Sequence, residues 1–205
     1  MYASLDASIS PAVPVALCTL ADAKALLGIT GSDKDAELNA RIGAATAAIE
    51  RYCGTIFGKR TVTETFRFPD RVSQIVLKYA PVVSVASVAI DGVAEDLANL
   101  DVAKALGIIR HGDFMAFGTA KTVVVYSAGY ESADIPPAVA RAALDLVAYE
   151  YRSQNQTDDI ARESVVDVGT AEYRSAAERT LTRNGVAVPA RIALALSLYV
   201  VGFAL

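Results

Sequence analysis

The sequence predicts an α+β fold in which a compact body carries an extended arm at each end. Two segments, near 35–52 and 137–152, repeat apolar residues at helical spacing. Between them, several short runs either alternate apolar and polar residues or are rich in β-branched ones, as β-strands are. Strands grouped between long helices are typical of an α+β body.

The arms are indicated by composition at both ends of the chain. Two prolines within the first 14 residues favour an extended start, and after residue 156 the chain turns polar before a final apolar stretch. We therefore expect an N-terminal arm at 1–16, a body at 17–156, and a C-terminal arm with an apolar terminal segment at 157–205.

End signals predict the first two helices. Thr19 and Asp22 form a capping-box pattern ahead of a short helix at Leu20–Leu27. The pattern recurs at Ser32 and Asp35, before a helix of about 17 residues. The apolar stripe of that longer helix consists of Leu38, Ile42, Ala45, Ile49 and Tyr52.

The sheet is predicted from runs with a period of two. Val62, Phe66 and Phe68 share one face of the first run, on which Glu64 is the only polar exception. Asp91–Gly92 is a hairpin-turn signal after the third run. The expected strands are Thr61–Phe68, Ser73–Lys78, Pro81–Asp91 and Thr122–Ala128, with a short pair at Leu100–Val102 and Gly107–Arg110.

A third long helix begins at Ile135-Pro136-Pro137, because proline is tolerated in the first turn, and runs to about Arg152. Its apolar residues form two ridges, and so wide an apolar face favours burial on two sides. We expect one ridge, at Ala140, Leu144 and Val147, to share a core with the stripe of the preceding long helix.

Composition excludes several classes of protein. The chain has 205 residues, 53% of them hydrophobic, so it has ample apolar surface to fold. Its net charge of −4 and pI of about 5.0 argue against a surface that grips nucleic-acid phosphates. Cys18 and Cys53 belong to no CxxC motif and are expected to be core thiols in a reducing cytoplasm.

No chemical constellation is recognisable. His111 and Asp113 lie close in sequence, but no nucleophile accompanies them. Asp158, Asp159 and Glu163 lack the spacing and the glycine of a calcium loop. Neither phosphate-binding glycine motif is present. We therefore expect no catalytic, cofactor-binding or metal site.

The last part of the chain is its most apolar stretch. From Ile192 to Leu205 no residue is charged, but 14 residues are too few for a bilayer span of about 20. We expect no membrane contact and infer that this stretch is buried against protein, in the chain's own core or in a partner.

Several segments, in order, resemble the head–tail connector (adaptor) proteins of long-tailed bacteriophages and gene transfer agents. The resemblance spans about 17–199. The segments are LCTLADAK from Leu17, IGAATAAIERYCGTIFGKRTVTETF from Ile42, PVVSVASVAIDG from Pro81, VVVYSAGYESADIPPAVARAALDLVAYEY from Val123, RESVVDVGTAEY from Arg162 and VPARIALALSLY from Val188. The chain departs from the family after Tyr199, where apolar residues replace the basic ones common there.

The resemblance implies a mainly helical body with a small antiparallel β-sheet part, assembled as a homo-oligomeric, dodecameric ring. Such a ring docks beneath the portal protein at the capsid vertex, passes DNA without sequence-specific binding, and presents a platform to a stopper or other tail protein. It implies synthesis in the bacterial cytoplasm, residence in the virion neck, and no catalysed reaction. The mild acidity of the chain suits a conduit that must not retain DNA.

Two assembly contacts are expected. The terminal segment resembles the one by which family members engage the portal, and as a helix it would dock in a groove. Alternatively, it folds back on its own body. The expected portal-docking residues are Arg191, Ile192, Leu194, Leu196, Leu198, Tyr199 and Phe203. Val165 and Val166, in a short strand, are expected to pair with the sheet edge of a neighbouring protomer.

Two other functions remain open at this point. A stopper or tail-completion protein would bind the tail side rather than the portal. An enzyme or small-ligand binding module would need a polar-lined pocket with perturbed titratable groups, for which the sequence supplies no candidate set.

Overall fold

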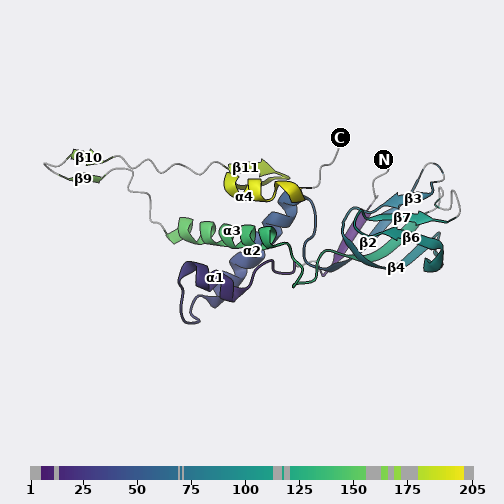
Figure 1. Ribbon diagram of the computed structural model, residues 1–205, viewed down its shortest axis with the longest axis horizontal. Coiled ribbons are helices and arrows are strands. Elements are labelled where there is room, and N and C mark those ends of the chain that lie inside the picture. Colours follow the sequence, from purple (N-terminus) through teal and green to yellow (C-terminus); the bar gives the residue numbers. More distant parts are fainter. Residues whose placement is uncertain are drawn as a thin grey trace.

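The computed structural model describes most of the chain. The described residues are 6–11, 14–68, 70, 72–112, 117, 121–155, 163–165, 169–171 and 180–200. They form a helical unit and a β unit, which lie side by side, and a separate small hairpin beyond the helical unit (Figure 1). Each of the two units has its own hydrophobic core.

Four helices build the helical unit, and their end signals explain its first boundaries. They are α1 (Leu20–Leu27), α2 (Asp35–Cys53), α3 (Pro137–Asn155) and α4 (Ala190–Ala195). The predicted cap of α1 is confirmed, because the Thr19 hydroxyl accepts from the backbone N–H of Asp22 at 3.1 Å. Left-handed glycines, Gly28 and Gly54, end α1 and α2.

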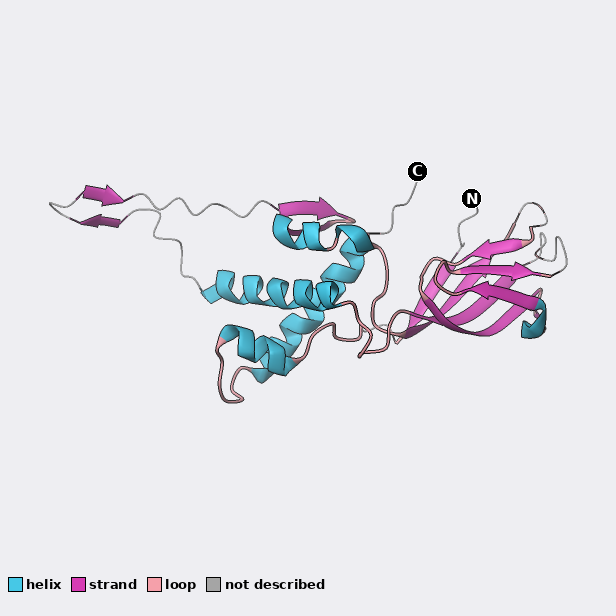
Figure 2. Ribbon diagram, in the orientation of Figure 1, coloured by secondary structure: helices cyan, strands magenta, loops and turns pink. Residues whose placement is uncertain are grey.

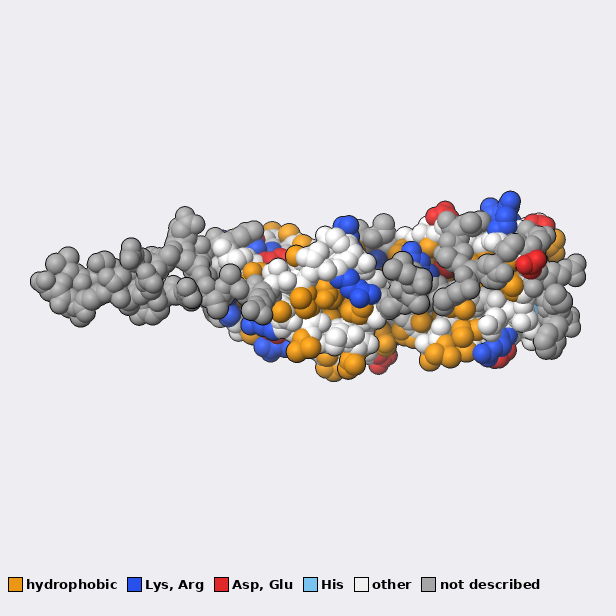
Figure 3. All heavy atoms as spheres, turned by 90° about the horizontal axis from the view of Figure 1, so that it is seen from above, with side chains coloured by type: hydrophobic (Ala, Val, Ile, Leu, Met, Phe, Trp, Pro, Cys, Tyr) orange, Lys and Arg blue, Asp and Glu red, His pale blue; other side chains and the backbone are white. Residues whose placement is uncertain are grey.

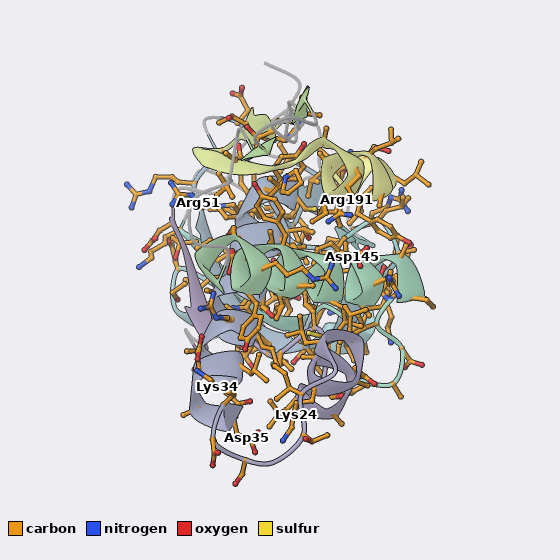
Figure 4. The ribbon with its side chains drawn as sticks, turned by 90° about the vertical axis from the view of Figure 1, so that its left-hand side faces the viewer. Lys24, Lys34, Asp35, Arg51, Asp145 and Arg191 are labelled. Carbon is orange, nitrogen blue, oxygen red and sulfur yellow. The ribbon has the colours of Figure 1, made fainter. Side chains whose placement is uncertain are left out.

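The predicted capping box of α2 is wrong. Lys34 occupies the N-cap without a side-chain hydrogen bond. Asp35 instead pairs with Lys24 of α1, whose ammonium lies 2.6 Å from its carboxylate (Figure 4). An acidic residue in the first turn still interacts favourably with the helix dipole, so Asp35 stabilises this helix end without a cap from Ser32.

The β unit consists of two sheets around a common core (Figure 2). The larger sheet has the order β1-β2-β8-β4-β5, and the smaller has the order β3-β7-β6; every pairing is antiparallel. The strands are β1 (Asp6–Ser10), β2 (Arg60–Phe66), β3 (Gln74–Val76), β4 (Val82–Ile90), β5 (Val93–Ala94), β6 (Leu100–Ala103), β7 (Ile108–His111) and β8 (Thr122–Ala128).

The alternation seen in the sequence explains the core of the β unit. Val62 and Phe66 of β2 point to the same side as Val124 of β8, and all three are fully buried. Ile75 of β3 and Ile109 of β7 close the core from the smaller sheet. A 3₁₀ turn, η1 (Leu97–Asn99), precedes β6.

Four further strands and a 3₁₀ turn belong to the C-terminal part. They are β9 (Glu163–Val165), β10 (Gly169–Ala171), β11 (Thr180–Arg183), β12 (Val186–Pro189) and η2 (Ser197–Tyr199). β9 pairs with β10 and β11 with β12, each as a two-stranded antiparallel hairpin.

A mainly helical body with a small sheet is therefore the wrong description of this fold. Of the described residues, about 35% are helical and about 34% are in strands. Two features make the difference. The short strands β3, β6 and β7 form a second sheet with a buried interior, and Asp6–Ser10 adds an edge strand to the first sheet. Strands of three or four residues become stable through this packing, which their sequence periodicity alone does not show.

Candidate assembly surface

The C-terminal segment has two opposite faces. Val188 of β12, Ile192 of α4 and Leu196 are buried in the helical core, each at most 2% exposed. Leu194 and Leu198 point the other way, at 75% and 91% exposure. At about 100° per residue, Ile192 and Leu196 share one side of a helix, and Leu194 and Leu198 share the other. The fold therefore splits the expected docking set between the chain's own core and solvent.

The other three expected docking residues, Arg191, Tyr199 and Phe203, lie in different places. Arg191 is exposed and lies on the same side of the helical unit as Asp145 of α3 (Figure 4). Tyr199 is half-buried and meets the Phe57 ring edge-on, with 6.0 Å between the ring centroids. Phe203 lies outside the described residues. The face that carries β11 and α4 displays hydrophobic side chains at the surface (Figure 3).

The β11–β12 hairpin is fixed to the end of α2 by its turn. Asn184, with φ of 49°, donates from its side-chain amide to the Arg51 carbonyl at 2.9 Å. Arg51 donates from Nε back to the Asn184 carbonyl, also at 2.9 Å. The Asn184–Gly185 turn thus gives a carbonyl group in the last turn of α2 a side-chain donor, in addition to the Gly54 N–H. This reciprocal pair, which we call the turn clasp, fixes where the C-terminal segment leaves the body.

The second expected contact lies in the β9–β10 hairpin. Val165 is in β9 and is paired with Gly169 of β10. Val166 lies outside the described residues. The hairpin lies beyond the end of α3, away from the β unit (Figure 1).

A buried ion pair joins the helical and β units. Arg60 of β2 donates to the carboxylate of Glu50 on α2, and the two side chains are 3% and 8% exposed. The other Glu50 oxygen accepts from the backbone N–H of Phe57 at 2.9 Å. Burial raises the pKa of Glu50, an effect that outweighs the opposing hydrogen bond from Phe57 and the charge of Arg60.

An open pocket of about 390 Å³ adjoins this ion pair. We call it the junction pocket, because α2, β2, the β3–β4 connection and both terminal segments contribute to its wall. Its lining includes Pro14, Glu50, Arg51, Arg60, Lys78 and Asn184. Sequence analysis did not identify this pocket. The signal available was weak, a glutamate and an arginine ten positions apart across a turn.

The chemical candidates form no catalytic arrangement among the described residues. His111 lies with Nε2 3.2 Å from the Glu95 carboxylate, and this hydrogen bond lowers the pKa of Glu95. Asp113, its sequence neighbour, is outside the described residues. Within the described ranges, no group of three or more histidine, cysteine or acidic side chains is placed to hold a metal ion.

Two other sequence expectations concern thiols and membranes. Cys18 and Cys53 are free and buried in the helical core, where burial raises the pKa of the Cys18 thiol to about 11 and that of Cys53 to about 12. Among the helices that the structure describes, none has both the length and the apolar character needed to cross a bilayer.

Comparison with known proteins identifies relatives of this chain. Residues 16–170 match the family model described as head completion protein. No curated protein matches the chain.

Solved structures of similar fold come from gene transfer agent (GTA) particles. A chain in the neck of an empty GTA particle, computed with C6 symmetry, is 23% identical over 72% of this chain and 84% of its own, with a TM-score of 0.59. A chain in the neck of a native particle, with C12 symmetry, is 21% identical with the same coverage and TM-score. A third, in the virion of a native particle, is 19% identical over 80% of this chain and 91% of its own, with a TM-score of 0.57.

Proposed function

Because the chain belongs to the head completion protein family, we propose that it is a structural head–tail connector of a phage or gene transfer agent particle. The observation that carries this proposal is the family match, which extends from the start of the helical unit to β10. The similar fold of chains in GTA necks supports the same location. In this role the protein would join structures and catalyse no reaction.

The finer proposal is a ring beneath the portal. Copies of the chain would form a homo-oligomeric, dodecameric ring at the virion neck, with a platform for the stopper or next tail protein. DNA would pass through its channel without sequence-specific binding. Support comes from the net charge of −4, since a basic channel would retain DNA through its phosphates. Synthesis would take place in the bacterial cytoplasm.

We propose that the C-terminal segment docks on the portal with its outer face. Ile192 and Leu196 hold the segment on the helical core, so they act as anchors. Leu194 and Leu198 remain available as the contact, and Arg191, Tyr199 and Phe203 complete the docking set. Burying a leucine contributes about 1.5–3 kcal/mol, so two such residues supply a substantial part of a docking energy.

In this proposal both ends of the chain contribute contacts between protomers. The N-terminal arm would be residues 1–16, of which Asp6–Ser10 also pairs with β2; the connector body would be 17–156, and the C-terminal arm 157–205, of which Ile192 and Leu196 also pack on the helical core. Val165 and Val166 would extend a sheet of the neighbouring protomer, which the open edges of the two-stranded β9–β10 hairpin favour.

A pair of surface substitutions tests the docking face. Leu194→Asp combined with Leu198→Asp should weaken co-purification with the portal protein of the same particle by at least about tenfold, because two charges would be desolvated. The melting temperature should stay within about 2 °C of the wild type, since both side chains face solvent.

The control is Leu106→Asp, at another leucine that is 65% exposed. It should leave portal binding unchanged. Full portal binding by the double variant would refute the docking proposal. If the wild-type protein binds only the tail-side protein and not the portal, the chain is a stopper instead.

A further inference from the structure

We propose that the junction pocket receives an acidic segment of a second copy of this chain, residues 157–169. The inference rests on the proposed function, because it concerns how neighbouring copies meet in an assembly. It adds a cationic receiving site on one copy and a complementary segment on the next.

Among the described residues, the rim of the pocket carries two cations that form no ion pair with an acidic side chain. Arg51 and Lys78 both line it and both are exposed. Within the described part of the chain, neither side chain forms a salt bridge, whereas Lys24, Lys59 and Arg141 each do. Arg51 uses its Nε for the turn clasp, and the Lys78 ammonium lies 5.3 Å from the centroid of the Tyr79 ring.

The residues deeper in the pocket do not neutralise the positive charge of Arg51 and Lys78. Its one acidic residue, Glu50, is paired with Arg60, so this ion pair adds no net charge. The pocket therefore presents an excess of positive charge over apolar walls. Ile9, Ala47 and Ile56 contribute to those walls. A ligand that fits is an acidic peptide with aliphatic side chains.

The chain itself contains such a peptide. Residues 157–169 have the sequence TDDIARESVVDVG, with four acidic residues against one arginine and with isoleucine and valines between them. Asp158 and Asp159 are adjacent, so they match a site with two cations on its rim. Charge complementarity of this kind mainly fixes which surfaces meet and in which register.

The position of the hairpin favours a second copy as the source. The β9–β10 hairpin lies beyond α3, at the end of the molecule remote from the β unit (Figure 1). The 24 residues between Asn155 and Thr180 can, as an out-and-back hairpin, extend about 40 Å from the body. The hairpin thus extends away from the chain's own junction pocket, which favours a second copy as the source of the segment.

A charge swap between two full-length variants tests the contact. One variant carries Lys78→Glu, and the other carries Asp158→Lys and Asp159→Lys. Each alone should weaken self-association at least about tenfold, measured by sedimentation velocity over a concentration series, because like charges then face one another. Mixed in equal amounts, the two variants should associate again. The acidic segment of the Lys78→Glu variant then finds the unchanged basic pocket of the other variant, and the lysine-substituted segment finds the pocket that carries the new glutamate.

The control is Lys121→Glu, which makes the same charge change at an exposed lysine outside the pocket. It should associate like the wild type, and melting curves should show all variants folded. Wild-type association should weaken from low to high salt. If the mixture fails to associate, the segment does not reach a second copy, and closure on its own pocket is the alternative.

A wild-type protein that stays monomeric at every concentration also overturns the inference. Neither result tests portal docking, because portal binding through Leu194 and Leu198 is measured separately; a permanently monomeric wild type would count against the ring as well. Conversely, a protein that fails to bind the portal but still self-associates would contradict the docking proposal and not the pocket contact.

Discussion

Glu64 is a carboxylate with no exposed surface, and its hydrogen bonds account for its place in the β core. The Tyr126 hydroxyl donates to it, and so does the backbone N–H of Lys78 at 3.0 Å. Burial, with the hydrogen bond to Glu64, raises the pKa of Tyr126, so the phenol stays protonated as a donor. The polar exception in the sequence pattern of β2 thus links β8 to the β3–β4 connection.

Glu64→Ala should lower the free energy of unfolding by about 2–4 kcal/mol, because it leaves the buried Tyr126 hydroxyl and the part-buried Lys78 N–H without their acceptor. Urea unfolding followed by circular dichroism measures the change. The matched control, Glu131→Ala, breaks an exposed ion pair with Lys59 and should cost less than about 0.5 kcal/mol. Equal losses in the two variants would contradict a structural role for the buried carboxylate.

The raised pKa of Glu50 predicts that its contribution to the free energy of unfolding changes with pH in the direction opposite to that of most acidic groups. Its pKa is raised in the folded state above the ordinary value of 4.5, so the folded protein holds this proton more tightly than the unfolded chain. Its contribution to stability is therefore present below about pH 4.5 and is lost as the pH rises through the folded pKa.

Comparison with Glu50→Gln isolates this contribution. From pH 4.5 upward, the unfolding free energy of the wild type should fall relative to that of the variant, measured by urea unfolding at a series of pH values. Parallel curves would show that Glu50 titrates alike in the folded and unfolded states.

At the scale of elements, the turn clasp ties a terminal segment to α2. Asn184→Gly keeps the left-handed turn accessible but removes the side-chain hydrogen bond, so it should cost about 1 kcal/mol. Asn184→Ala should cost about 1–2 kcal/mol more, because alanine resists a positive φ. Thermal unfolding measures both. If the two variants are equally stable, the conformation of the turn contributes nothing.

The positions of the helices and of most strands could be predicted from the sequence, but the pairing that places β3 in a second sheet with β7 and β6 could not. Thr19 and the stripe from Leu38 to Tyr52 determine α1 and α2 locally, through capping and periodicity. β3 has only three residues, and Ile75 is buried because β7 pairs with it from more than 30 positions away. A pairing of that kind is a property of the tertiary structure, which local periodicity does not carry.

The apolar character of the C-terminal segment predicted that it would be buried against protein, and its inner side is buried in the chain's own helical core. Docking of its outer side on a partner stays a prediction. Which leucines face solvent depends on where the helical core receives the segment, and only the fold shows that Leu196 is buried and Leu198 is exposed. The junction pocket escaped prediction because Arg51, Lys78 and Asn184 come from three distant parts of the chain.

At the scale of the whole molecule, a short connection determines how the helical and β units meet. The backbone N–H of Tyr130 donates to the Phe57 carbonyl at 2.6 Å, and that of Lys59 donates to the Tyr130 carbonyl at 2.8 Å. These bonds connect the segment just before β2 to the segment just after β8. With the Glu50–Arg60 ion pair, they fix the helical unit against the β unit. A connector that transmits contacts between a capsid and a tail needs such a fixed junction.

Gly129 lies at the closest approach in this junction. Its φ is +100°, and a Cβ there would lie 2.8 Å from the Gly58 carbonyl oxygen and 2.9 Å from that of Phe57. Backbone atoms cannot move aside as a side-chain end can. Gly129→Ala should therefore lower the free energy of unfolding by about 2–4 kcal/mol, through both the strained φ and the displaced backbone.

Gly43→Ala is the matched control, because this glycine lies inside α2 with open space around its Cβ position. Alanine there should stabilise the protein by about 0.5–1 kcal/mol, since glycine is a poor helix former. Urea unfolding followed by circular dichroism measures the free energy of unfolding of each variant relative to the wild type. A Gly129→Ala protein as stable as the wild type would mean that the two units are not held at this contact, and the rigid junction that the connector role calls for would have to be sought elsewhere.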